Sequence, residues 1–183
     1  MYRAVFLDRD GTISEEVGYI YHAGLYKVFS WSGPAIRKIN EHGMKAIVIT
    51  NQSGVGRGYF DEGSVEEVHD ILRGELAVHN AKLDAIYTCT HHPEAGCDCR
   101  KPNSGMLLKA RDEMNIDLTQ SFVIGDKYLD VETAHNVGAK GILVLTGYGR
   151  EEREKHKSSR RQPDLIADNL MDAVDAILRG VVE

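Results

Sequence analysis

Short apolar runs alternate with segments of helical periodicity along most of the chain. The runs are rich in β-branched residues, and they predict strands at 4–7, 45–50, 85–89, 122–124 and 142–145, with an edge strand at 165–166. Helices are predicted between them, at 32–42, 63–79, 104–114, 128–137 and 169–178. Strands that alternate with helices form a mostly parallel sheet covered on both faces, so we expect a three-layer α/β fold. The length of 183 residues suits a single domain over residues 1–183.

The composition is that of a globular protein in water. Hydrophobic residues make up 42% of the chain, charged residues 27%, and the formal net charge is −6. A negative net charge argues against a nucleic-acid partner, and no apolar run reaches the length of a membrane span. Three cysteines within eleven residues do not suggest a secreted disulfide framework. We therefore expect a cytoplasmic monomer, without nucleic-acid or membrane partners, in which the charged stretch 150–161 is a solvated face or a mobile loop.

Carboxylates follow two of the predicted strands. Asp8 and Asp10 come after the first strand, and Asp126 comes after the fourth. The carboxyl ends of parallel strands meet at one edge of a sheet, and carboxylates gathered there need a cation, for which Mg²⁺ is suited. Asp8 is then a candidate nucleophile and Asp10 a candidate acid/base. For Asp8 and Asp10, the alternative is an ordinary turn at the Asp-Gly pair, and for Asp126 it is a role as helix cap. Asp130 either supports the site or faces solvent.

Two further stretches offer groups that bind anions. Residues 50–53 carry hydroxyl and amide side chains at the end of the second strand, as a phosphate cradle or as a plain polar turn. Arg100 and Lys101 are adjacent cations that either neutralise a phosphoryl group or form a solvated pair. Lys127, next to Asp126, has the same two possible roles: it either neutralises a phosphoryl group or is a solvated cation.

The cysteines lie in the pattern of a metal site. Cys89 and His91 are followed after five residues by Cys97 and Cys99, a set that can hold a tetrahedral, structural Zn²⁺. His92 is an alternative to His91, and free thiols in a reducing compartment are the alternative to the metal. A zinc ion would order the loop 89–101 and fix the direction of the two cations at its end.

Four motifs, at 8–12, 50–54, 97–102 and 125–127, resemble those of the haloacid-dehalogenase (HAD) superfamily of phosphatases. They resemble more closely its branch of D-glycero-D-manno-heptose 1,7-bisphosphate 7-phosphatases, over residues 3–147. The resemblance implies a Rossmann-like HAD fold without a large cap domain. It also implies an open pocket whose walls are the loops 13–24 and 89–101.

The resemblance also implies roles for single residues. Asp8 would attack phosphorus and form a phosphoaspartyl intermediate, and Asp10 would protonate the leaving sugar oxygen and later activate water. Mg²⁺ would be held by the Asp8 carboxylate, the Asp10 carbonyl and Asp126. The phosphoryl group would be bound by Thr50, Asn51, Arg100 and Lys101. Further substrate contacts would come from Glu16, Val17, Gly18, Tyr19, Gln52, Ser53 and Lys127. The zinc ligands would be Cys89, His91, Cys97 and Cys99.

The function expected from this resemblance is a Mg²⁺-dependent phosphomonoesterase that removes the 7-phosphate of a heptose 1,7-bisphosphate. Gly18-Tyr19 and the sequence from Ser53 to Arg57-Gly58 favour this branch. A histidinol-phosphate phosphatase, whose branch also carries such a zinc loop, is the alternative among enzymes. The alternative outside enzymes is a phosphate-sensing module that has lost turnover.

Overall fold

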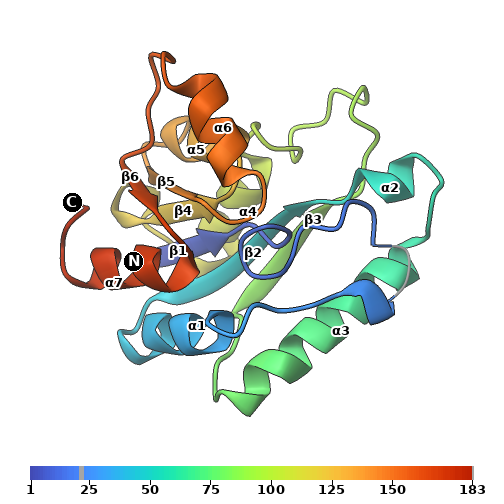
Figure 1. The fold of residues 1–183 in the computed structure, drawn as a ribbon, viewed down its shortest axis with the longest axis horizontal. Coiled ribbons are helices and arrows are strands. Elements are labelled where there is room, and N and C mark those ends of the chain that lie inside the picture. Colours follow the sequence, from blue (N-terminus) through green and yellow to red (C-terminus); the bar gives the residue numbers. More distant parts are fainter. Residues whose placement is uncertain (21–22, 183) are drawn as a thin grey trace.

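A computed structural model describes residues 1–20 and 23–182. Its strands form one parallel sheet in the order β3-β2-β1-β4-β5-β6 (Figure 1). The strands are β1 (Ala4–Leu7), β2 (Lys45–Asn51), β3 (Ala85–Cys89), β4 (Phe122–Gly125), β5 (Lys140–Val144) and β6 (Leu165–Ala167). The chain builds outward from β1 through β2 to β3, then returns to the other side of β1 with β4. The strand order therefore reverses between β1 and β4, which is where ligands bind in open α/β sheets.

Helices cover both faces of the sheet, as the alternation of elements predicts. One face packs against α1 (Ser32–Glu41), α3 (Glu62–Val78) and α7 (Leu170–Leu178), and the other packs against α4 (Gly105–Met114) and α5 (Tyr128–His135). Val5 and Leu7 of β1 belong to the first core and Ala4 and Phe6 to the second, all fully buried. Burial on both faces explains why β1 is a continuous apolar run. The three-layer αβα fold is confirmed.

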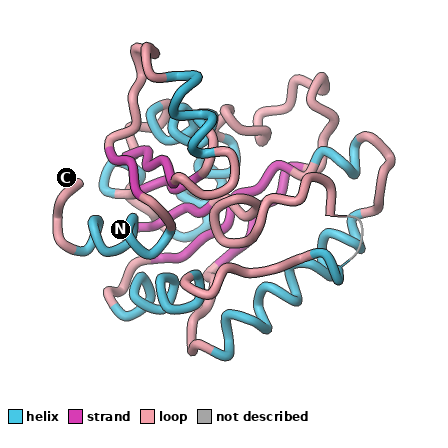
Figure 2. Tube along the Cα trace, in the orientation of Figure 1, coloured by secondary structure: helices cyan, strands magenta, loops and turns pink. Residues whose placement is uncertain are grey.

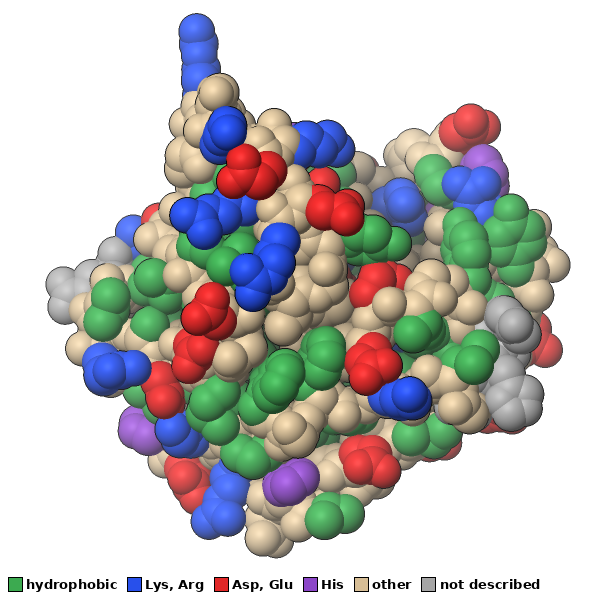
Figure 3. All heavy atoms as spheres, viewed as in Figure 1, with side chains coloured by type: hydrophobic (Ala, Val, Ile, Leu, Met, Phe, Trp, Pro, Cys, Tyr) green, Lys and Arg blue, Asp and Glu red, His purple; other side chains and the backbone are tan. Residues whose placement is uncertain are grey.

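Two helices were not predicted. The four-residue α2 (Ser53–Gly56) follows β2, and α6 (Gly149–His156) occupies part of the charged stretch. Figure 3 shows acidic and basic side chains together over α6, so the solvated face is the correct alternative for 149–156, and it is helical.

Some predicted boundaries were wrong. α3 begins at Glu62 rather than at 63, and its cap is the Asp61 side chain, which accepts from Ser64 N. α4 begins at Gly105 rather than at 104, and the Ser104 hydroxyl does not cap it but donates to the carbonyl of Thr133 at 3.2 Å. β5 spans Lys140–Val144 rather than 142–145, and α5 ends at His135 rather than 137.

Loops run over the carboxyl edge of the sheet (Figure 2). Of the predicted loop 13–24, Tyr21 and His22 lie outside the described residues, and the 3-10 turn η1 (Ala23–Leu25) follows them. The described parts of 8–31 and 90–104 add no strand to a second sheet, so the expected absence of a large cap domain holds for them. None of the described helices has the length and apolar composition needed to cross a membrane.

Candidate active site

A polar cavity of about 330 Å³ lies at the carboxyl ends of β1 and β2, beside the start of α5. It brings together nearly all of the predicted substrate and catalytic residues, from segments far apart in the chain. Its lining comprises Asp8, Asp10, Glu16, Gly18, Tyr19, Thr50, Asn51, Gln52, Ser53, Arg100, Lys101, Lys127, Leu129 and Tyr148. Val17, predicted to contact substrate, does not line the cavity and is 47% exposed.

Lys101 is buried among negatively charged groups. Its Nζ donates to Asp8 Oδ1 at 2.8 Å, to Asp130 Oδ1 at 2.6 Å and to the carbonyl of Ile49 at 3.0 Å. Burial alone would lower the pKa of Lys101, but the charges of Asp130 and Asp8 outweigh it and raise that pKa. The solvated Arg-Lys pair is therefore wrong for Lys101, which lies against the proposed nucleophile.

The Asn51 side chain holds the backbone at Lys101. Its Oδ1 accepts from Lys101 N and its Nδ2 donates to Lys101 O, both at 3.1 Å. Asn51 thus fixes the direction in which the buried cation leaves the loop. Arg100, the neighbouring cation, lines the cavity with a buried terminal nitrogen that has no hydrogen-bond partner among the described residues.

Three carboxylates meet beside Lys101. Oxygen atoms of Asp8, Asp126 and Asp130 lie within 4.8 Å of one another. Burial, followed by the charge of Asp8, raises the pKa of Asp126 to about 8, and burial is also the largest cause that raises the pKa of Asp130 to about 6. Asp126 Oδ2 accepts from Tyr148 N at 2.8 Å, whereas its buried Oδ1 has no partner in the described chain. The donor set and the unpartnered oxygen fit a hard divalent cation such as Mg²⁺.

Two glycines pack against the Asp126 carboxylate, where a side chain would not fit. A Cβ at Gly11 or Gly147 would lie 2.1 or 2.2 Å from Asp126 Oδ2, and both glycines have positive φ. The capping alternative for Asp126 is not what the structure shows. α5 instead takes its cap from Asp130, whose Oδ2 accepts from Lys127 N at 3.3 Å.

The Asp10 side chain points toward Arg9 and Gln52 rather than toward the three carboxylates. It accepts from Arg9 Nε at 3.0 Å, from Arg9 Nη2 at 2.8 Å and from Gln52 Nε2 at 2.8 Å. Gln52 also donates to Thr50 Oγ1 at 2.8 Å. The predicted cradle at 50–53 is thus an ordered wall of the cavity.

Lys127, which also lines the cavity, faces an acid and an aromatic ring. Its Nζ lies 3.1 Å from Glu16 Oε2 and 4.5 Å from the centre of the Tyr148 ring. Glu16 also accepts from Gly18 N at 2.8 Å, which orders the loop that carries Tyr19. The cavity therefore combines cationic, hydroxyl and aromatic groups.

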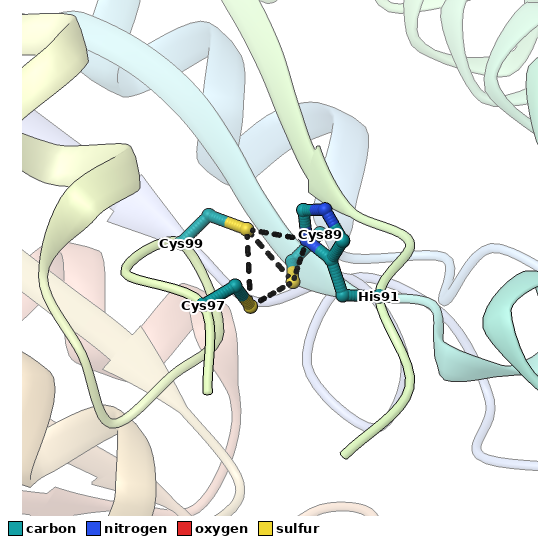
Figure 4. Close-up of side chains that lie close together, drawn as sticks. All are labelled: Cys89, His91, Cys97 and Cys99. Atoms are coloured by element: carbon teal, nitrogen blue, oxygen red, sulfur yellow. Dashed lines mark hydrogen bonds between the residues drawn. The ribbon is translucent and has the colours of Figure 1, made fainter. Parts of the chain in front are cut away.

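A second group of residues that could hold a metal ion lies at the end of β3 and in the loop after it. The side chains of Cys89, His91, Cys97 and Cys99 point toward one another (Figure 4). The sulfur atoms are 2.9, 3.5 and 3.6 Å apart, and His91 Nδ1 is 3.2 Å from Cys99 Sγ. A tetrahedral zinc site places its sulfur atoms about 3.8 Å apart, so the cluster is compatible with Zn²⁺. His92 instead lies near Glu94, which removes it as the alternative ligand.

Known proteins resemble this chain over most of its length. A family model described as HAD-hydrolase-like matches residues 98–173. The D-glycero-beta-D-manno-heptose-1,7-bisphosphate 7-phosphatase of Escherichia coli (strain K12) is 42% identical over 79% of this chain and 80% of its own length. The Haemophilus influenzae protein of the same name is 38% identical over 95% and 94%. The chain belongs to the heptose-bisphosphate 7-phosphatase family.

The solved structures agree. The D,D-heptose 1,7-bisphosphate phosphatase from B. bronchiseptica, complexed with magnesium and phosphate, has a TM-score of 0.90 at 28% identity and covers 97% of this chain and 98% of that one. The enzyme of the same name from Burkholderia thailandensis has a TM-score of 0.73 at 26% identity, over 96% and 98%. The superfamily and branch that the four motifs resemble are thus confirmed.

In this member of the heptose-bisphosphate 7-phosphatase family, the cavity includes two residues that the sequence did not single out, and the structure decides between the two alternatives for Asp130. Leu129 and Tyr148 line the cavity. Asp130 is buried and accepts a hydrogen bond from Lys101 Nζ, so the solvent-facing alternative for Asp130 was wrong. The four-residue spacing from Asp126 was a signal for Asp130. Tyr148 and the buried His69 gave no such signal, because Asp126 and Arg9, which they contact, come from distant segments.

Proposed function

We propose that the chain is a Mg²⁺-dependent phosphomonoesterase that removes the 7-phosphate of D-glycero-D-manno-heptose 1,7-bisphosphate. One observation carries the proposal: Asp8 lines a polar cavity with the Lys101 ammonium 2.8 Å from its Oδ1 and two further buried carboxylates beside it. A carboxylate held in this way has the surroundings of a nucleophile that attacks a phosphoryl group. The names of the relatives support the choice of substrate.

The reaction would proceed in two steps. In the first, an Asp8 oxygen forms a bond to phosphorus, the bond from phosphorus to the sugar oxygen breaks, and Asp10 gives that oxygen a proton. In the second, water attacks phosphorus, Asp10 takes the proton of the water, and the bond between Asp8 and phosphorus breaks. Inorganic phosphate leaves, and both side chains return to their starting states.

The cations and amide groups of the cavity would bind the group in transfer. Arg100 and Lys101 face it with positive charge, and Thr50 and Asn51 stand at the end of β2 beside them. Interactions with charge that develops in the transition state supply most of the catalysis in phosphoryl transfer. Lys127 and Tyr148, which contact each other in the cavity lining, would meet the remainder of the substrate.

Both metals belong to the proposal. Mg²⁺ would be held by Asp8, by Asp126 and by the Asp10 carbonyl, and it would neutralise phosphoryl oxygens. The unpartnered Asp126 Oδ1 supports this placement. Zn²⁺ would be held by the cluster of three cysteines and His91, and its role would be structural because four protein ligands close its shell.

The direct test compares substrates. Purified protein with Mg²⁺ is incubated with D-glycero-D-manno-heptose 1,7-bisphosphate or with histidinol phosphate, and phosphate release is followed at several concentrations of each. We expect kcat/KM for the heptose bisphosphate to exceed that for histidinol phosphate by at least about 100-fold, a difference of roughly 2.7 kcal/mol. The reverse preference would replace the proposal with the histidinol-phosphate alternative. A protein inert on both, and on a panel of other phosphoesters, would favour the phosphate-sensing module.

A further inference from the structure

Arg9 stands between the two catalytic aspartates in the sequence, and its side chain is almost wholly buried, at 1% exposure. A guanidinium out of water needs partners for its charge and its donors. It has three: the Asp10 carboxylate, the His69 ring nitrogen Nε2 at 3.4 Å from its Nη1, and the face of Tyr26, whose centre is 5.5 Å from its Cζ. These partners come from three segments of the chain, so the guanidinium has a defined place.

The contact with Asp10 fixes a direction. Arg9 donates through Nε to Oδ1 and through Nη2 to Oδ2, so both carboxylate oxygens are held in the plane of the guanidinium. Gln52 adds a third donor, on Oδ2 at 2.8 Å. An acid/base group transfers protons efficiently only from a set position, and a displacement of about 1 Å can cost roughly 100-fold in rate.

His69, on α3, holds the far side of Arg9. It is 2% exposed, and its Nδ1 lies 3.3 Å from Glu66 Oε2. Glu66 Oε1 in turn accepts from Arg73 Nη1 at 2.8 Å, so the chain of contacts extends to the surface. A guanidinium can only donate, so Nε2 must accept and the ring proton must sit on Nδ1, toward Glu66. Burial and the charge of Arg9 lower the pKa of His69, in keeping with a neutral ring.

We propose that Arg9 and His69 are positioning residues of the phosphatase reaction, and that His69 holds the Arg9 guanidinium so that Arg9 can set the direction of the Asp10 carboxylate. The inference rests on the proposed function, in which Asp10 protonates the leaving oxygen. Neither residue lines the cavity, so neither touches the substrate. Their effect would reach the reaction through Asp10 alone.

The test uses leaving groups that differ in their need for a proton. A sugar alkoxide must be protonated as it leaves, whereas p-nitrophenolate leaves without help. The ratio of kcat/KM for the heptose bisphosphate to kcat/KM for p-nitrophenyl phosphate therefore reports proton donation in the first step. His69→Leu removes the acceptor for Arg9, His69→Gln keeps one, and Leu76→Ala is a control for lost packing in the same buried face of α3.

We expect His69→Leu to lower this ratio by about tenfold or more, His69→Gln to lower it less than threefold, and Leu76→Ala to leave it unchanged. A purely structural role for His69 would lower both rates by the same factor, and a constant ratio in folded His69→Leu overturns the proposal. Should His69→Leu fail to fold, Arg9→Lys serves instead. The lysine side chain keeps the positive charge but cannot hold both oxygens of Asp10. We therefore expect Arg9→Lys to lower the ratio by a factor similar to that for His69→Leu.

A crystal structure of His69→Leu provides a readout that does not depend on activity. Arg9 displaced from its two-point contact with Asp10 would support the proposal, and an unchanged contact would overturn it. If the wild type releases no phosphate from the heptose bisphosphate, the proposed function fails, and the crystal structure still decides whether His69 holds Arg9 in place.

Discussion

Lys101 is the cation against which the buried carboxylates of Asp8 and Asp130 are placed. The side chains of Lys101 and Asp130 are 1% and 0% exposed, and that of Asp8 is 9% exposed. Bringing these charges out of water is costly, so the cluster is weak evidence for high stability. Removing one partner is different, because it leaves the others charged and unpaired in the interior.

We predict that Lys101→Met lowers both stability and turnover. The free energy of unfolding should fall by about 3–5 kcal/mol, because two buried carboxylates lose their cation. The value of kcat should fall by at least about 100-fold, because a positive charge at the transferring group is lost. Urea denaturation and phosphate release measure the two effects.

A double variant separates the two effects. Adding Asp130→Asn to Lys101→Met removes one stranded carboxylate and should restore part of the stability, while turnover stays low. A Lys101→Met protein as stable as the wild type would contradict the role given to this cation.

Among the site residues, those in short motifs were predictable and those that depend on packing were not. Asp8, Asp10 and Lys101 follow strands or loops in recognisable order, and the rule for parallel sheets places them at one edge. Tyr148 reaches the cavity only because the loop after β5 folds back over Asp126. Val17 does not line the cavity, and the direction of a loop side chain could not be predicted from its position in the sequence.

The loop that carries the cysteines also joins the elements around the cavity. Gly56 N of α2 donates to the carbonyl of Thr90 at 2.9 Å, and Gly105 N of α4 donates to that of Asp98 at 3.0 Å. Both glycines pack so closely on the loop that a Cβ would lie within 2.5 Å of its backbone. The loop ends at Arg100 and Lys101, so its order determines where these cations lie.

We predict about one zinc ion per chain, lost together with stability in Cys97→Ser. The melting temperature and kcat should both fall, since the cations at the end of the loop lose their support. Asp98→Asn is the matched control, because Asp98 is an exposed loop residue outside the ligand set, and it should keep metal and activity. Elemental analysis and thermal unfolding provide the measurements. Zinc-free protein of undiminished stability would exclude a structural metal.

Most elements could be predicted because a buried face imposes periodicity on the sequence. The helix α2 has four residues, two of them glycines, so no period exists to be read. The helix α6 lacks an apolar stripe, since nearly all of its residues are charged. It is held instead by contacts with Tyr128, whose ring stacks on His156 at 4.4 Å and whose N donates to Glu152 at 2.9 Å. Such contacts cannot be inferred from composition.

The fold places the cavity where the strand order reverses, and it buries Asp126, one of the proposed magnesium ligands, deeply. Asp126 is fully buried, and its pKa of about 8, raised by burial and by Asp8, lies far above the ordinary value of 3.8. The folded, metal-free protein thus binds a proton on Asp126 more readily than the unfolded chain does. The stability from this proton is complete below pH 4 and is lost as the pH rises toward 8.

We therefore predict that stability depends on pH and metal together. In the presence of EDTA, the melting temperature of the wild type should fall between pH 5 and pH 8 relative to that of Asp126→Asn, whose side chain does not titrate. Added Mg²⁺ should raise the melting temperature of the wild type more at pH 8 than at pH 5, and should do little for the variant. If the melting temperatures of the two metal-free proteins changed with pH in parallel, burial would not raise the pKa of Asp126.

The covalent role of Asp8 is tested by Asp8→Asn, which keeps the size and the polar contacts of the side chain but removes the nucleophile. Phosphate release from D-glycero-D-manno-heptose 1,7-bisphosphate is measured for both proteins with Mg²⁺, after zinc content and melting temperature show that the variant is folded. We expect kcat to fall by at least about 10⁴-fold, as for removal of a catalytic nucleophile. A folded variant that retains a tenth or more of the wild-type rate would show that the phosphoryl group is not transferred to this carboxylate.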